Sequence, residues 1–168
     1  MLFSYAEEVA PKDVTNREGF AAKVYFNALF GNDFIRGARD PLNYALDYGY
    51  TVLLSCFNRE VVSCGYLTQL GLGHKNEFNP FNFSCDLIEP FRVIVDEFIY
   101  AVKPTVFDTE YRRKLVKLLS RKIRYGKEYY LTDAISVYVR NVAECIKSGD
   151  MEKLKLYEFE IYENVRDI

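Results

Sequence analysis

Apolar side chains recur every three or four residues along most of the chain, which is the spacing of amphipathic helices. Proline and glycine, which most often interrupt helices, number only 5 and 9. Residues 122–131, with Tyr125-Gly126 at their centre, instead predict a small hairpin. The pattern predicts helices over residues 18–30, 42–67, 85–103, 109–120, 132–148 and 151–165.

Several helix ends carry capping residues. Asp40-Pro41 is a strong helix start, because aspartate accepts hydrogen bonds from free N–H groups and proline fits the first turn. We expect Asp13 or Thr15 to cap the first long helix. Pro90 is compatible with a helix only within its first turn.

Residues 69–84 break the helical pattern. Glycine, asparagine and proline are frequent there, so the segment predicts a loop of unusual length. Long connections in compact domains often carry function. We therefore look for functional residues in this loop first.

The composition is that of an ordinary globular protein. The 168 residues are 49% apolar and 27% charged, enough for a core that needs no disulfides. The four cysteines form no C-x-x-C pair, which excludes a zinc ribbon and a thioredoxin motif and indicates reduced thiols in the cytosol. The predicted fold class is mainly α, a single multi-helix domain over residues 1–168 with at most one small hairpin.

The sequence predicts neither a signal peptide nor a membrane span. Glu7 and Glu8 stand where a signal peptide requires an apolar run. The longest stretch without Asp, Glu, Lys or Arg is residues 61–74, and its 14 residues fall short of the roughly 18 that a spanning helix needs. We expect a soluble, cytoplasmic protein. A net charge of −2 argues against a uniformly basic nucleic-acid binder but allows a local basic face.

One histidine and three carboxylates carry the candidate chemistry. His74 lies in the long loop, Glu89 follows fifteen residues later with Asp86 three residues before it, and Glu18 opens the first long helix. Carboxylate and imidazole ligands suit Mg²⁺ or Mn²⁺. From spacing alone, a lone loop histidine is usually a surface or capping residue, and Asp86 fits a helix N-cap as well as a ligand.

A set of motifs in fixed order resembles the CRISPR-associated integrases, the catalytic proteins of spacer acquisition, and in particular their type II branch. The resemblance is specific from residue 13 to residue 103 and looser beyond. Its motifs are Asp13-x-Thr15-Asn16-Arg17-Glu18-Gly19-x-Ala21-Ala22-Lys23-x-Tyr25-Phe26, Phe34-Ile35-Arg36, Asn43-x-Ala45-Leu46-Asp47-Tyr48-Gly49-Tyr50, Leu70-Gly71-Leu72-Gly73-His74 and residues 79–92, NPFNFSCDLIEPFR.

The resemblance implies that Glu18, His74 and Glu89 are catalytic metal ligands for Mg²⁺ or Mn²⁺. Other branches of the family commonly carry aspartate at the position of Glu89. Asp86 is then expected to act as an outer-sphere partner or to reach the ion through water. The implied function is a metal-dependent DNA endonuclease and integrase, in which a DNA 3′-hydroxyl attacks a phosphodiester of the CRISPR repeat.

The resemblance also implies partners. These are DNA with processed ends, the leader-repeat junction, and a small second adaptation protein that bridges dimers of the full-length protein in a prokaryotic cytoplasm. Proteins of this family usually carry an N-terminal β-rich domain of roughly another hundred residues, a normal domain size. We therefore expect residues 1–168 to represent the catalytic domain without that half.

Charge is distributed unevenly. Residues 112–127 hold eight basic and no acidic residues, so a DNA contact and a merely solvated helix face are both open. Arg36, Arg39 and Arg92 are further candidates for DNA contacts, and Arg92 lies three residues from Glu89. Two other functions stay open: a metal-dependent nuclease without integration, and a catalytically silent helical module that binds DNA or protein.

Overall fold

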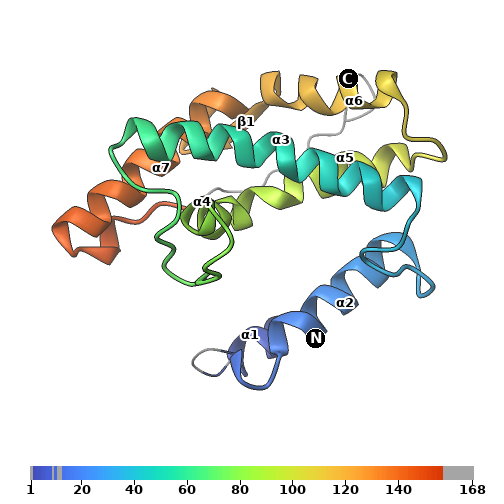
Figure 1. Ribbon diagram of the computed structural model, residues 1–168, viewed down its shortest axis with the longest axis horizontal. Helices are drawn as coiled ribbons and strands as arrows, with labels where there is room; N and C mark the ends of the chain where they lie inside the picture. The colour runs from blue at the N-terminus through green and yellow to red at the C-terminus, as the bar shows by residue number, and fades with distance from the viewer. Residues whose placement is uncertain (1, 9, 11–12, 157–168) are drawn as a thin grey trace.

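The computed structural model describes residues 2–8, 10 and 13–156, and within them the chain is mainly helical with one hairpin, as predicted (Figure 1). The helices are α1 (Leu2–Glu7), α2 (Arg17–Phe30), α3 (Pro41–Ser63), α4 (Asn82–Ile88), α5 (Arg92–Val102), α6 (Thr109–Lys117) and α7 (Leu131–Ser148), with 3₁₀ turns η2 (Glu89–Phe91), η3 (Leu118–Ser120) and η4 (Met151–Lys153); the strands are β1 (Lys122–Tyr125) and β2 (Lys127–Tyr130).

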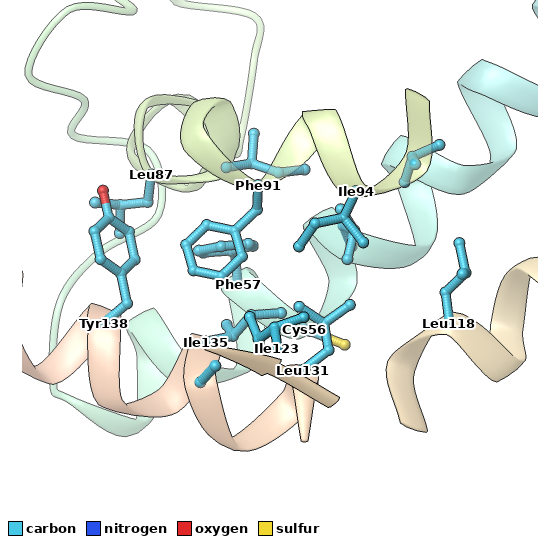
Figure 2. Close-up of a cluster of buried hydrophobic side chains, with 14 of the residues drawn as sticks. Cys56, Phe57, Leu87, Phe91, Ile94, Leu118, Ile123, Leu131, Ile135 and Tyr138 are labelled. Atoms are coloured by element: carbon cyan, nitrogen blue, oxygen red, sulfur yellow. The ribbon is translucent and has the colours of Figure 1, made fainter. Parts of the chain in front are cut away.

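Helix α3 is the centre of the fold. It runs the length of the helical body and packs against α4, α5, α6 and α7 (Figure 1). Phe57 of α3 meets Phe91 and Tyr138 edge to face, with ring centroids 5.3 and 6.3 Å away. Figure 2 shows these rings among aliphatic side chains that converge from the surrounding elements, including Leu87, Ile94, Leu118, Ile123, Leu131 and Ile135.

Glycine at position 49 permits the closest approach within this core. A Cβ built there lies 2.5 Å from Cγ1 of Val95 on α5, a separation that real carbon atoms do not adopt. The absence of a side chain therefore allows α3 and α5 to pack closely at this point.

The two strands pair antiparallel, with Ile123 opposite Tyr129. The side chains of Ile123 and Tyr125 are buried, which anchors the hairpin on the core. Gly126 at the turn has φ +73°, a conformation that favours glycine. This confirms the hairpin predicted around Tyr125-Gly126.

Helix α2 stands apart from the helical body (Figure 1). All fourteen of its residues are described, and none is buried. Its C-terminal half reaches the core through an aromatic cluster in which Phe26 and Phe30 pack with Phe34, at centroid distances of 5.1–6.3 Å. The N-terminal half projects outward.

Several predicted boundaries are confirmed and others are corrected. Asp40 caps α3 by accepting from the N–H of Asn43. Asp13 accepts from the backbone of Arg17 and Glu18 and so caps α2 from outside the helix.

Three helix predictions need correction. Pro90 does not lie in the first turn of one long helix; it converts residues 89–91 into a 3₁₀ turn between α4 and α5. Helix α3 ends at Ser63 rather than near residue 67, because the chain turns at Gly65 with φ +82°. The helix predicted over residues 151–165 is reduced to one 3₁₀ turn within the described part, and residues 157–165 lie outside it.

The four cysteines all lie in the described part of the chain and are free thiols, in agreement with the sequence. Cys56 and Cys145 are buried, whereas Cys64 and Cys85 are partly exposed. Across the described residues, no helix combines the length and apolar character that crossing a membrane requires.

Substitution of Gly49 tests the packing of α3 against α5. Gly49→Ala should lower the free energy of unfolding by about 1–3 kcal/mol, because the new methyl group overlaps Val95. Urea unfolding followed by circular dichroism measures the change. Val95→Ala in the same chain makes room for the methyl group, so the double variant should lose less stability than the two single losses added together. An unfolding midpoint for Gly49→Ala equal to that of the wild type would show that this contact is not tight.

Candidate metal centre

The long loop after α3 is held by specific hydrogen bonds although it contains no regular structure. The buried amide of Asn82 donates to the carbonyl oxygens of Gln69 and Asn76, at 3.1 and 2.7 Å. The hydroxyl of Thr68 donates to the carbonyl of Pro80 at 2.7 Å. These bonds fix both ends of the loop against the start of α4.

Asp86 on α4 holds the middle of this loop. Its carboxylate accepts hydrogen bonds from the backbone N–H groups of Leu72, Gly73 and His74. A Cβ on Gly71 would lie 2.3 Å from the carbonyl oxygen of His74 and 2.9 Å from Oδ2 of Asp86. The glycines of the Gly-x-Gly sequence therefore allow the backbone to wrap closely around the carboxylate.

The same carboxylate orients the imidazole of His74. Oδ1 of Asp86 lies 2.6 Å from Nδ1 of His74, so Nδ1 carries the proton and donates it. In the neutral ring, Nε2 then carries the lone pair, and the side chain is half exposed. A carboxylate behind the imidazole is the usual support of a metal-binding histidine. The alternative of Asp86 as an N-cap is wrong, because α4 begins at Asn82 and Asp86 lies within it.

The hydrogen bonds to Asp86 stabilise its charged form. Partial burial disfavours the carboxylate charge, but the donors from His74, Gly73 and Leu72 outweigh it and lower the pKa of Asp86. Asp86 is therefore an anion with both oxygens engaged by the loop.

Glu89 lies one turn after Asp86, at the start of η2. Loss of solvation raises the pKa of Glu89; Arg92 and His74 oppose this rise, and the carboxylates of Glu18 and Asp86 add to it. The guanidinium of Arg92 lies 3.1 Å from the Glu89 carboxylate. The carboxylates of Glu18 and Asp86 thus act on Glu89, but the larger opposing effect comes from Arg92.

Glu18 lies in the first turn of α2, apart in the sequence from the loop and from α4. Its side chain is exposed, and its charge still acts on Glu89. The carboxylate oxygens of Glu18 and Glu89 and Nε2 of His74 are of the types that Mg²⁺ or Mn²⁺ binds. In residues 2–8, 10 and 13–156, however, no group of three or more His, Cys, Asp or Glu side chains is close enough to hold a metal ion.

The three arginines predicted to contact DNA differ in their surroundings. Arg36 turns back onto its own chain, where it bonds Asn43 at 3.1 Å and pairs with Asp47. Arg92 lies over the ring of Tyr50, 5.2 Å from its centroid, beside Glu89. Arg39 is exposed between α2 and α3. Their role toward DNA stays a prediction.

One polar cluster near this centre was missed in the sequence. Asp96 on α5 is only 3% exposed and accepts hydrogen bonds from the hydroxyls of Tyr25 and Tyr50. An aspartate on the apolar face of the 91–99 segment, between Val95 and Phe98, is the signal that would have revealed it.

The class of protein follows from fold and sequence together: a mainly helical domain in which Asp86 of α4 orients the imidazole of His74. The family described as CRISPR associated protein Cas1 matches residues 4–124 of this chain. The chain therefore belongs to the Cas1 family.

Individual relatives agree with this assignment. The chain is 35% identical over 163 residues to the CRISPR-associated endonuclease Cas1 of Neisseria meningitidis serogroup C (strain 8013), which covers 94% of this chain and 54% of that protein. It is 36% identical over 92 residues to a CRISPR-associated endonuclease Cas1 of Thermodesulfovibrio yellowstonii, covering 49% of this chain and 29% of that one. The chain thus spans about half the length of the Neisseria relative, and its matches cover less of the others.

A solved structure shares the fold. The chain superposes on a casposase bound to integration product with a TM-score of 0.73, over 90% of this chain and 55% of that one. The identity is 23%, so this likeness concerns the fold alone.

Removal of the Asp86 carboxylate tests how the loop is held. Asp86→Ala should speed hydrogen exchange at the amides of residues 72–74 by about tenfold or more, because each loses a charged acceptor. NMR exchange measurements report these amides individually. Asp150→Ala, which removes a carboxylate that accepts from Glu152 elsewhere, is the matched control and should leave the loop unchanged. Equal exchange in wild type and Asp86→Ala would refute this role of Asp86.

Proposed function

We propose that this chain is the catalytic domain of a CRISPR integrase, a metal-dependent DNA endonuclease that joins new spacers to the repeat array by transesterification. The observation that carries the proposal is the imidazole of His74, held through Nδ1 by Asp86 so that Nε2 is available, beside Glu89. Membership of the Cas1 family and the printed names of its endonuclease relatives support it.

Glu18, His74 and Glu89 would hold the metal, and Mg²⁺ or Mn²⁺ would supply Lewis acidity that stabilises charge on the phosphate oxygens. Asp86 keeps the imidazole in the required tautomer and orientation, because its carboxylate accepts the Nδ1 proton. His74 would act as a ligand and not as a base, since Nδ1 donates to Asp86 and a metal-bound Nε2 could not also accept a proton.

In this proposal Arg92 orients the phosphate. Its guanidinium is held against the Glu89 carboxylate at 3.1 Å and against the ring of Tyr50, so its charge lies beside the proposed metal position. In the reaction the 3′-hydroxyl oxygen forms a bond to phosphorus, and the existing P–O3′ bond of the repeat breaks. The hydroxyl proton leaves the nucleophile, and the departing 3′ oxygen gains a proton.

The biological setting is part of the proposal. It comprises DNA ends and the leader-repeat junction as substrates, a small second adaptation protein as partner, dimers of the full-length protein, and antiviral defence in a prokaryotic cytoplasm. A casposase whose structure is described as bound to an integration product shares the fold of this chain. Since the chain spans about half of the Neisseria relative, these partners belong to the longer protein in this proposal.

Substitution of each ligand tests the proposal. Glu18→Ala, His74→Ala and Glu89→Ala should each lower the rate of disintegration of a branched DNA at least about 100-fold, because one ligand is lost. The assay resolves the DNA products with Mg²⁺ or Mn²⁺ and with a chelator, and circular dichroism verifies the fold.

Glu77→Ala is the matched control, since Glu77 is an exposed glutamate of the same loop. It should keep wild-type activity. Wild-type activity in Glu18→Ala, or activity that survives the chelator, would contradict the proposal. Cleavage of the branched DNA without a joined strand would favour the nuclease that does not integrate.

A second candidate function is a DNA-binding module without catalysis. The basic face of α6 favours it: Arg113 and Lys117 lie one turn apart and are both exposed. The double substitution Arg113→Ala/Lys117→Ala should weaken binding of duplex DNA and reduce the slope of log affinity against log salt by about 2, since two phosphate contacts are lost. Fluorescence anisotropy at several salt concentrations measures both quantities. An unchanged slope would mean that this face does not contact DNA.

A further inference from the structure

The ligand on α2 is the least firmly attached of the three. None of the fourteen residues of α2, all of them described, is buried, and Glu18 occupies its outward N-terminal turn. Hydrophobic packing holds the other end of the helix, where Phe26 and Phe30 contact Phe34. A polar contact made by a residue between Glu18 and Phe26 therefore influences the position of Glu18.

That contact is the hydrogen bond from Tyr25 to Asp96. The hydroxyl of Tyr25 donates to Oδ2 of Asp96 at 2.9 Å, and the hydroxyl of Tyr50 donates to Oδ1. Asp96 is 3% exposed, so the bond is largely shielded from water. One carboxylate thus joins α2, α3 and α5.

Cationic side chains complete the cluster. The guanidinium of Arg36 lies 5.7 Å from the centroid of the Tyr50 ring, and that of Arg92 lies 5.2 Å from it. Burial raises the pKa of Asp96, and the hydrogen bonds from the two tyrosines and the charges of Arg92 and Arg36 oppose this rise only in part. Arg92 also contacts Glu89, so the cluster is continuous with the candidate metal centre.

Because of the residue spacing, this contact determines where Glu18 lies relative to Glu89. Tyr25 follows Glu18 by seven residues on α2, and Asp96 follows Glu89 by seven along η2 and α5. Seven residues are about two helical turns, so each pair shares one side of its segment. In Figure 1, α2 and α5 run in the same direction across the molecule. Tyr25 against Asp96 therefore directs Glu18 toward Glu89.

We infer that Tyr25 and Asp96 are positioning residues that set the approach of Glu18 to Glu89 and His74. The inference rests on the proposed function, in which these three side chains bind the metal. Asp96 then has a role beyond joining the three helices. When the Tyr25 hydroxyl is lost, the aromatic cluster still attaches α2, but its N-terminal turn is less constrained.

Metal affinity separates this role from simple stabilisation. Tyr25→Phe keeps the aromatic ring and removes only the hydroxyl, and it should weaken Mn²⁺ binding about tenfold, the factor expected for one lost hydrogen bond to a charged group. Electron paramagnetic resonance follows free Mn²⁺ in titrations of the full 168-residue chain. Asp96→Asn should have a similar effect, and the two substitutions together should weaken binding by less than the product of the single effects.

Tyr66→Phe is the matched control. It also removes a hydroxyl, which donates to the carbonyl of Ala143 at 3.2 Å, far along the sequence from α2. It should lower the unfolding midpoint as Tyr25→Phe does but leave Mn²⁺ affinity unchanged. Hydrogen exchange without metal gives a second readout: the amides of residues 17–24 should exchange faster in Tyr25→Phe than in Tyr66→Phe.

The outcomes distinguish the inference from the proposed function. Wild-type Mn²⁺ affinity in Tyr25→Phe, equal weakening in Tyr66→Phe, or equal exchange of α2 in both variants would overturn the inference and leave the proposed function intact. A wild-type chain that binds no Mn²⁺, or whose binding is unaffected by Glu89→Gln, would overturn the proposed function and the inference with it.

Discussion

Burial of α3 against four other helices is the constraint from which the rest of the architecture follows. Its approach to α5 at Gly49 leaves no room for a Cβ beside Val95, and the ring of Phe57 fills the space against Phe91 and Tyr138. These contacts fix α5 and the 3₁₀ turn before it, so Glu89 stands on the best-anchored part of the candidate centre. A buried core of this kind transmits small volume changes, because it is packed as densely as an organic crystal.

The three proposed ligands are attached to this core with decreasing firmness, in the order Glu89, His74 and Glu18. Glu89 is part of the backbone that packs on α3. His74 is attached through charged hydrogen bonds, since Asp86 on α4 holds both its backbone and its ring. Glu18 stands on a helix without buried residues, fastened by an aromatic cluster and by the hydrogen bond of Tyr25 to Asp96. In the proposed centre the charge of Glu18 acts unfavourably on that of Glu89, and a bound divalent cation would relieve this repulsion.

The sequence predicts the elements that depend on local chemistry and misses those that depend on packing. The helix start at Asp40-Pro41 and the hairpin turn at Gly126 could be predicted, because these residues themselves favour the backbone conformation found there. Pro90 was expected in the first turn of one helix. It instead separates α4 from α5, and this break depends on the packing of Phe91 against Phe57, which the sequence does not show. Asp86 was expected to act as an outer-sphere partner or to reach the ion through water, but its hold on the loop was not predicted, because the loop amides that it accepts from are twelve to fourteen residues away. Asp96 was missed because its partner Tyr25 is 71 residues distant.

The location of a bound metal tests most directly whether Glu18, His74 and Glu89 are its ligands. Crystals of the 168-residue chain soaked in Mn²⁺ and measured near the manganese absorption edge locate the ion through its anomalous scattering. We expect one peak at about 2.0–2.3 Å from Nε2 of His74 and from carboxylate oxygens of Glu18 and Glu89, the usual range for such ligands. Asp86 should remain on Nδ1 and outside the coordination sphere. A peak coordinated by Asp86, or one remote from His74, would show that Glu18, His74 and Glu89 do not form the metal site.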